Sequence, residues 1–332
     1  MAQQKTVQFG IFPGSVDVEW RALQQVWQVA DDLGFSSAWV PDHFYSGSGN
    51  PEGSCFEALT IVAAMAASIR NIRIGPMVLG NTYRHPALVA NMAATLDHIS
   101  GGRLNLGMGA GWMQSEHEGY GIALPGPRER LDRLDEALTV MKLLFTEHRA
   151  NFKGKYYELN NALCEPKPIQ KPYPRLVIGG AGEKRTLRVV ARHADEWNGE
   201  VGPDGMKRKL DILHEHCRVV GRDPSEIDVS VLLRGEGEAK TTFDAMVRNG
   251  NLNIIADRDR LIAEGVPATE LEDRLRETVY SQFLPMDPAK AIDRLNEYVA
   301  IGVTSFILLI RPPYDLAKLE RFMSRVAPHV HA

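Results

Sequence analysis

The chain has 332 residues, of which 44% are hydrophobic and 24% charged, and its formal net charge is −4 at neutral pH. These proportions are typical of a globular protein, and the absence of any basic block argues against nucleic acid or an anionic membrane as a partner. The longest apolar stretch falls far short of the roughly 20 residues of a membrane span. The three cysteines are scattered along the chain, so we expect free thiols in a reducing, cytoplasmic setting.

Apolar strand-like runs alternate with helical segments along the chain. Eight runs are predicted as strands, at residues 7–12, 37–41, 72–79, 104–108, 176–178, 195–198, 227–233 and 304–310. Eight segments are predicted as helices, at residues 18–33, 56–69, 86–99, 128–147, 183–193, 203–220, 288–300 and 316–326. Such apolar runs suit strands that are buried on both faces, and eight strand–helix units favour a single (β/α)8 TIM barrel over a doubly wound sheet.

Three segments interrupt this alternation and are interpreted as insertions in one barrel domain that spans residues 1–332. Residues 109–127 form a loop rich in Gly, Trp and Glu. Residues 151–174 contain "FKGKYYEL", which alternates like a small β excursion, followed by a proline-rich connector. Residues 235–286 are polar and show no clear pattern.

The candidate site residues follow predicted strands, where a TIM barrel carries its chemistry. Asp42 and His43 end the second strand. Glycines follow the fourth and fifth strands, as Gly109, Gly111, Gly179, Gly180 and Gly182, with Ala181 between the last two. Glycine lets a ligand approach the backbone closely and leaves N–H groups free to face it. The run at 179–182 just before a helix predicts a phosphate site, with a tight turn as the alternative interpretation.

His43 has three interpretations: a general acid or base, a wall of a cofactor site, or a structural histidine. Asp42 is a natural hydrogen-bond partner for a ligand group or for a backbone N–H. Glu116 either serves chemistry or fixes the long loop, and the second is favoured. Aromatic side chains on the same presumed face could line a slot for a planar ring, or could simply be core; these are Phe44, Tyr45, Tyr83 and Trp112. No metal-binding motif is present.

Long stretches of the chain resemble the luciferase-like monooxygenase superfamily. Within it, the resemblance is strongest to the F-420-dependent oxidoreductase branch. The stretches that carry the resemblance are "DLGFSSAWVPDHF", "IRIGPMVLGNTYRHPALVANMAATLDHISGGRLNLGMGAGW" and "PRLVIGGAGEKRTLRVVARHADEWN". The resemblance implies a flavin-like ring across the top of the barrel near Asp42, Met77, Val78, Gly109 and Gly111, and a phosphate near 179–182. It also implies a bulge in the third strand with a cis peptide bond at Met77–Val78.

The resemblance implies an oxidoreductase that transfers a hydride between the deazaflavin coenzyme F-420 and a small organic substrate. His43 would then supply or accept the proton, with Asp42 beside it. The alternative is a monooxygenase that uses reduced FMN and oxygen, and a more remote one is a flavin-binding barrel without catalysis. A flavin or F-420 reductase partner and a homodimer are further expectations. The sugar-phosphate dehydrogenase relatives carry a catalytic glutamate where this chain has Trp112, so the substrate stays open.

Overall fold

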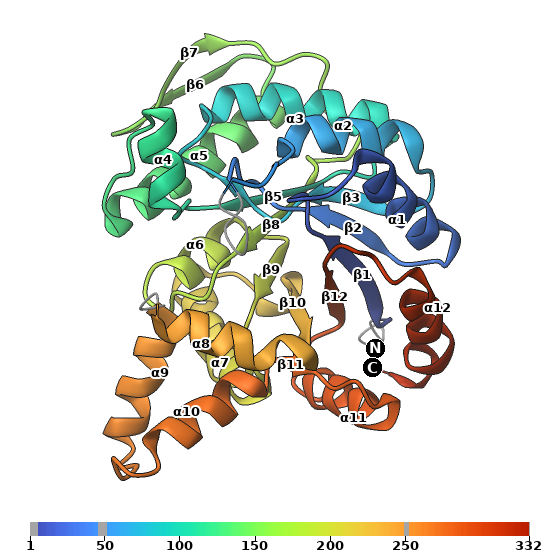
Figure 1. Ribbon diagram of the computed structural model, residues 1–332. Coiled ribbons are helices and arrows are strands. Elements are labelled where there is room, and N and C mark those ends of the chain that lie inside the picture. Colours follow the sequence, from blue (N-terminus) through green and yellow to red (C-terminus); the bar gives the residue numbers. More distant parts are fainter. Residues whose placement is uncertain (1–5, 46–51, 249–251, 332) are drawn as a thin grey trace.

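Eight parallel strands form a nearly closed barrel with helices around it (Figure 1). The fold is taken from a computed structural model, which describes residues 6–45, 52–248 and 252–331. The hydrogen-bonded strand order is β3-β2-β1-β12-β10-β9-β8-β5-β4. An isolated parallel bridge between Ile74 and Leu104 joins the two ends of this order. The predicted (β/α)8 barrel is therefore confirmed.

The strands and helices of the barrel lie close to their predicted positions. The barrel strands are β1 (Gln8–Pro13), β2 (Ser37–Val40), β3 (Arg73–Pro76) continued by β4 (Leu79–Gly80), β5 (Asn105–Gly109), β8 (Arg175–Gly179), β9 (Glu196–Gly199), β10 (Asp228–Gly235) and β12 (Ser305–Ile310). The outer helices are α1 (Trp20–Asp32), α2 (Ala58–Ser68), α3 (Pro86–Ser100), α5 (Pro127–Thr146), α6 (Thr186–His193), α7 (Pro203–Val220), α11 (Pro288–Val299) and α12 (Leu316–Arg325). None of the described helices is long and apolar enough to cross a membrane.

The three predicted interruptions contain additional elements. The first holds a helix, α4 (Gln114–Tyr120), where only a loop was predicted. The second holds an antiparallel pair, β6 (Ala150–Lys153) and β7 (Glu158–Ala162). The third was predicted to be without pattern, but it contains α8 (Ala239–Arg248), α9 (Leu252–Ala263), α10 (Leu271–Tyr280) and β11 (Phe283–Leu284). Figure 1 shows α9 and α10 projecting from the barrel.

The helices of the third insertion enclose a small core of their own. Phe243, Ile254, Leu261, Leu275 and Val279 are buried there. Each helix contributes only two buried residues to this core, so the apolar pattern of the segment is weak although the helices enclose a cluster. The prediction missed these helices for that reason.

A layer of apolar side chains fills the middle of the barrel. It consists of Phe12, Trp39, Met77, Val177, Leu232 and Ile307. The indole of Trp39 is 2% exposed and its Nε1 donates to Ser37 Oγ at 2.8 Å. A Cβ on Gly10 would lie 2.3 Å from that same Oγ, so glycine is needed to leave room for the pair. The barrel is thus a packed core with two separate ends.

Candidate active site

The carboxyl ends of the barrel strands meet at one end of the barrel, which we call the mouth. In barrels of this kind the mouth is where ligands bind and react. The structure places the predicted site residues here, after four neighbouring strands. They are Asp42 and His43 after β2, Met77 and Val78 after β3, Gly109 and Gly111 at and after β5, and Gly179, Gly180, Ala181 and Gly182 at and after β8.

The imidazole of His43 is held by a buried carboxylate. Its Nδ1 lies 3.1 Å from Glu116 Oε1 and 3.2 Å from Oε2. Glu116 comes from α4 and its side chain is fully buried, whereas that of His43 is 26% exposed. With Nδ1–H donating to Glu116, the lone pair of the neutral ring lies on Nε2. Nε2 has no hydrogen-bond partner within the described ranges, so it is available to a ligand.

Glu116 accepts hydrogen bonds from three further groups, which lie on the segments that follow β2 and β4. Its Oε1 accepts the backbone N–H of Phe44 at 2.7 Å and that of Tyr45 at 3.1 Å, and its Oε2 accepts the hydroxyl of Tyr83. Burial works against ionisation of Glu116, but the bonds from His43, Tyr83 and Tyr45 outweigh it and lower its pKa to about 2. Burial and the same carboxylate raise the pKa of Tyr83, so its hydroxyl stays a donor. Glu116 is therefore ionised and fixes both the loop and the imidazole.

Asp42 is turned away from the open side of the mouth. Both of its oxygens accept from Arg84, at 2.9 Å each, and Oδ2 also accepts the N–H of Gly80 at 2.8 Å. Arg84 further contacts Glu57, the residue that caps α2. Of the two partners expected for Asp42, the structure shows the backbone N–H. Asp42 thus ties β4 and α2 to the end of β2, and it positions His43 through the chain.

Val78 occupies the middle of the mouth, above the apolar layer. The Met77–Val78 peptide bond is cis and separates β3 from β4, as the resemblance implies. A Cβ on Gly109 would lie 2.6 Å from Val78 Cγ2, and a Cβ on Gly179 would lie 3.0 Å from both Val78 methyl groups. These two glycines therefore leave the space that the Val78 side chain fills. Met77 faces down into the apolar layer and is 9% exposed.

The glycine run after β8 presents two unpaired N–H groups. The carbonyl of Gly180 accepts from Trp197 Nε1 at 2.8 Å, and that of Ala181 accepts from Lys209 Nζ at 2.8 Å. The C=O and N–H of a trans peptide point in opposite directions. The N–H groups of Ala181 and Gly182 consequently point away from these donors, and neither has a partner among the described residues. Gly180 has φ +132°, which favours glycine.

The helix after this run begins later than predicted. Helix α6 starts at Thr186 and not at residue 183, because residues 183–185 form turns. The run is held instead by Trp197 of β9 and Lys209 of α7. Lys209 is 6% exposed, and its Nζ also lies 3.0 Å from Glu183, which pairs with Arg208 at 2.7 Å. The cradle for an anion is therefore made by an anchored loop more than by a helix end.

The four aromatic residues predicted near the mouth behave differently from one another. Phe44 contacts Tyr83, with ring centroids 4.7 Å apart, and stacks on Tyr120 at the same distance. Tyr45 lies 5.7 Å from Tyr120. These rings pack mainly on each other. Trp112 is 66% exposed and meets the His43 ring edge to face at 5.6 Å, so it is the ring best placed to touch a substrate.

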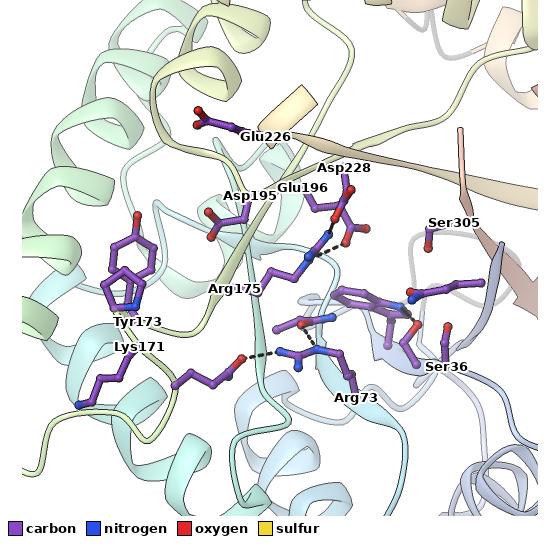
Figure 2. A pocket seen from close by; sticks show the side chains of 16 residues that line it. Ser36, Arg73, Lys171, Tyr173, Arg175, Asp195, Glu196, Glu226, Asp228 and Ser305 are labelled. Carbon is purple, nitrogen blue, oxygen red and sulfur yellow. Dashed lines mark hydrogen bonds and ion pairs between the residues drawn. The ribbon is translucent and has the colours of Figure 1, made fainter. Parts of the chain in front are cut away.

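The opposite end of the barrel, here called the floor, holds a cavity of about 550 Å³. Figure 2 shows the charged side chains around it, with Arg175 between Glu196 and Asp228. Each barrel strand contributes one polar residue to its lining: Gln8, Ser37, Arg73, Asn105, Arg175, Glu196, Asp228 and Ser305. The floor has a cavity, but His43 and the glycine-rich run at 179–182 lie at the mouth. We place the active site at the mouth because the groups that could react with or bind a ligand are there.

Three residues that matter at the mouth were missed or undervalued in the sequence. Glu116 was predicted mainly as a loop anchor, because α4 was not recognised and its partners lie more than 30 residues away. Arg84 and Lys209 gave no signal, since each sits inside or beside an ordinary helix. Only the folded chain brings them to the strand ends. No three His, Cys, Asp or Glu side chains gather as a metal site in the part of the chain that the structure describes.

The chain belongs to the luciferase-like monooxygenase family, whose profile matches residues 6–305. An F420-dependent glucose-6-phosphate dehydrogenase from Kineococcus radiotolerans is 28% identical over 315 residues, which cover 90% of each chain. An FMNH(2)-dependent dimethylsulfone monooxygenase from Pseudomonas putida is 26% identical, over 67% of this chain and 65% of its own.

Solved structures share the fold. An F420-dependent secondary alcohol dehydrogenase, solved with an F420–acetone adduct, superposes with a TM-score of 0.76 at 20% identity. The match covers 99% of this chain and all of that one. At this level of identity the likeness establishes the barrel architecture and does not extend to the substrate.

Proposed function

We propose that this protein is an oxidoreductase that transfers a hydride between coenzyme F-420 and a small organic substrate. The observation that carries the proposal is the imidazole of His43, oriented at the mouth by a buried ionised carboxylate with its Nε2 left free. The F420-dependent relatives over 90% of the chain favour the deazaflavin as the partner.

The mouth fits a flavin-like cofactor on grounds of shape and donors. A ring would rest on the backbone around Val78 and beside Gly109, where any Cβ would displace the valine. Its phosphate would meet the N–H groups of Ala181 and Gly182, which anions favour. Trp112 would border the space between the ring and the substrate.

The bound deazaflavin would supply a two-electron hydride acceptor or donor. The protein's part is to move the proton that accompanies the hydride. In alcohol oxidation, Nε2 of neutral His43 accepts the hydroxyl proton, and the resulting imidazolium is stabilised by Glu116 at 3.1 Å. In the reverse direction the same nitrogen returns the proton to a carbonyl oxygen. Tyr83 and the two backbone N–H groups keep Glu116 in place throughout.

A monooxygenase that uses reduced FMN is the second candidate, because an FMNH(2)-dependent relative also matches. Anaerobic assays separate the two. We expect oxidised F-420 to be reduced without oxygen when a suitable alcohol is present, and reduced FMN with oxygen to give no substrate oxidation. The reverse result would favour the monooxygenase, and failure to bind either cofactor would favour a barrel without catalysis.

A further inference from the structure

An ion pair stands at the mouth on the wall that faces His43. Around the barrel, β9 is four strands from β2 in both directions, so residues that follow β9 lie opposite His43. Glu200 follows β9, and its Oε1 lies 2.6 Å from Nε of Arg234 in β10. A ligand that reaches Nε2 of His43 with one end would direct its other end toward this pair.

Strand alternation places both side chains on the inner face. Asn198 in β9 bonds across to Ser230 in β10 at 3.0 Å, inside the barrel, and Leu232 belongs to the apolar layer. Glu200 comes two residues after Asn198, and Arg234 comes two residues after Leu232. Alternate residues of a strand share a face, so both side chains point inward, nearer to the mouth. Their side chains are 39% and 21% exposed.

The pair keeps hydrogen-bonding capacity for a ligand. Glu200 Oε2 and the two terminal nitrogens of Arg234 have no hydrogen-bond partner within the described ranges. A second ion pair lies on the same rim, where Arg311 Nε is 2.8 Å from Glu238 Oε2. An anion that approached Arg234 would meet the Glu200 carboxylate beside it.

We propose that Glu200 and Arg234 select substrates with an uncharged group that both donates and accepts hydrogen bonds, such as a carboxamide, and disfavour carboxylates and phosphates. The carbonyl of such a group accepts from Arg234 while its N–H donates to Glu200. An anion satisfies Arg234 but is repelled by Glu200. This inference rests on the proposed function and names the substrate class for it.

The test compares secondary hydroxy acids of graded length with their carboxamides, assayed anaerobically with oxidised F-420. We expect wild-type kcat/KM to favour the amides by about tenfold or more. Glu200→Gln keeps the size and removes the opposing charge, so the preference should shift toward the acids. Glu215→Gln, in the exposed ion pair with Arg218 at the C-terminal end of α7 and away from this rim, is the matched control and should leave the ratio unchanged.

A binding measurement makes the inference independent of turnover. The same acids are titrated calorimetrically into wild type, Glu200→Gln and the double variant Glu200→Gln/Arg234→Gln. Only Glu200→Gln should gain affinity for acids, because only there is an uncompensated guanidinium present. A wild-type preference for acids or for glucose 6-phosphate, or an unchanged ratio in Glu200→Gln, overturns the inference. Loss of cofactor reduction with every substrate, while the titration behaves as expected, overturns the proposed function alone.

Discussion

Glu116 and His43 are 73 residues apart in sequence and 3.1 Å apart in the structure, and the same carboxylate also holds the backbone that carries the imidazole. The buried Glu116 carboxylate thus fixes the position and the tautomer of the His43 imidazole, and it also holds the loop that carries His43.

His43→Ala should lower kcat by about 10²–10⁴-fold, the usual contribution of a general acid or base. Cofactor affinity should change little, because the ring is expected to rest on the backbone near Val78 and Gly109. His43→Gln retains a hydrogen bond but carries no proton at neutral pH, so it should be nearly as slow. Steady-state kinetics and fluorescence titration of the cofactor check both statements. Full activity in the glutamine variant would reduce His43 to an orienting group.

Glu116→Gln should destabilise the fold by about 1–3 kcal/mol and also lower kcat, since an amide nitrogen cannot accept the bonds that a carboxylate oxygen accepts. Chemical denaturation and turnover at a temperature where both proteins are folded separate the two effects. Glu118→Gln on the same helix is the matched control, because among the described residues its carboxylate bonds only to the exposed Gln114. Equal behaviour of the two variants would contradict the role given to Glu116.

Lowering the pH should reduce the free energy of unfolding, because Glu116 then becomes protonated. Its folded-state pKa of about 2 lies below the ordinary value of 4.5. A depressed pKa means that the unfolded chain binds the proton more readily, so the stabilisation is present above pH 4.5 and is lost as the pH falls toward 2. Unfolding free energies measured across this range should drop less steeply in Glu116→Gln than in wild type. Parallel curves would show that Glu116 does not carry this dependence.

Gly109→Ala should weaken cofactor binding by pushing Val78 out of place, because the new Cβ would lie 2.6 Å from a Val78 methyl group. Adding Val78→Ala removes that methyl group and should restore part of the affinity. Gly126→Ala, where nothing lies within 4 Å of the new Cβ, serves as the control. Fluorescence quenching measures the dissociation constants, and an unaffected Gly109→Ala variant would argue against a cofactor at Val78.

Lys209→Met should weaken binding of a phosphate-bearing cofactor by about tenfold, which is near the ~1.5 kcal/mol of one charge-assisted hydrogen bond. Without Lys209 the Ala181 carbonyl loses its donor, and the adjoining N–H is free to turn away from the phosphate. The deazaflavin chromophore that lacks the phosphate should bind equally well to both proteins. Lys207→Met, on the exposed side of the same helix, is the control.

The barrel could be predicted from the sequence because each strand is a short apolar run that alternates with a helix of the expected length. The positions of His43, of Gly109 and of the glycine-rich run at 179–182 followed from the rule that strand ends meet at one face. Their partners could not be predicted. Glu116 and Lys209 lie on helices and Arg84 lies just before one, and the local pattern there carries no sign of the contacts made across the fold.

The third insertion shows a different limit. Its helices bury Phe243, Leu275 and Phe283 in a cluster assembled from segments about 40 residues apart, so no local window contains the full apolar face. The Met77–Val78 cis bond was expected only through family resemblance, since nothing in the local residues distinguishes it from a trans bond.

The packed layer around Trp39 divides the barrel into two compartments that share walls but no space. The cavity of about 550 Å³ at the floor can take a screening compound, yet it lies on the far side of that layer from Val78 and His43. A fragment that binds at the floor should therefore raise the melting temperature without displacing the cofactor, and its inhibition should be noncompetitive. Hits from thermal-shift screening of this protein need a competition assay before they count as active-site ligands.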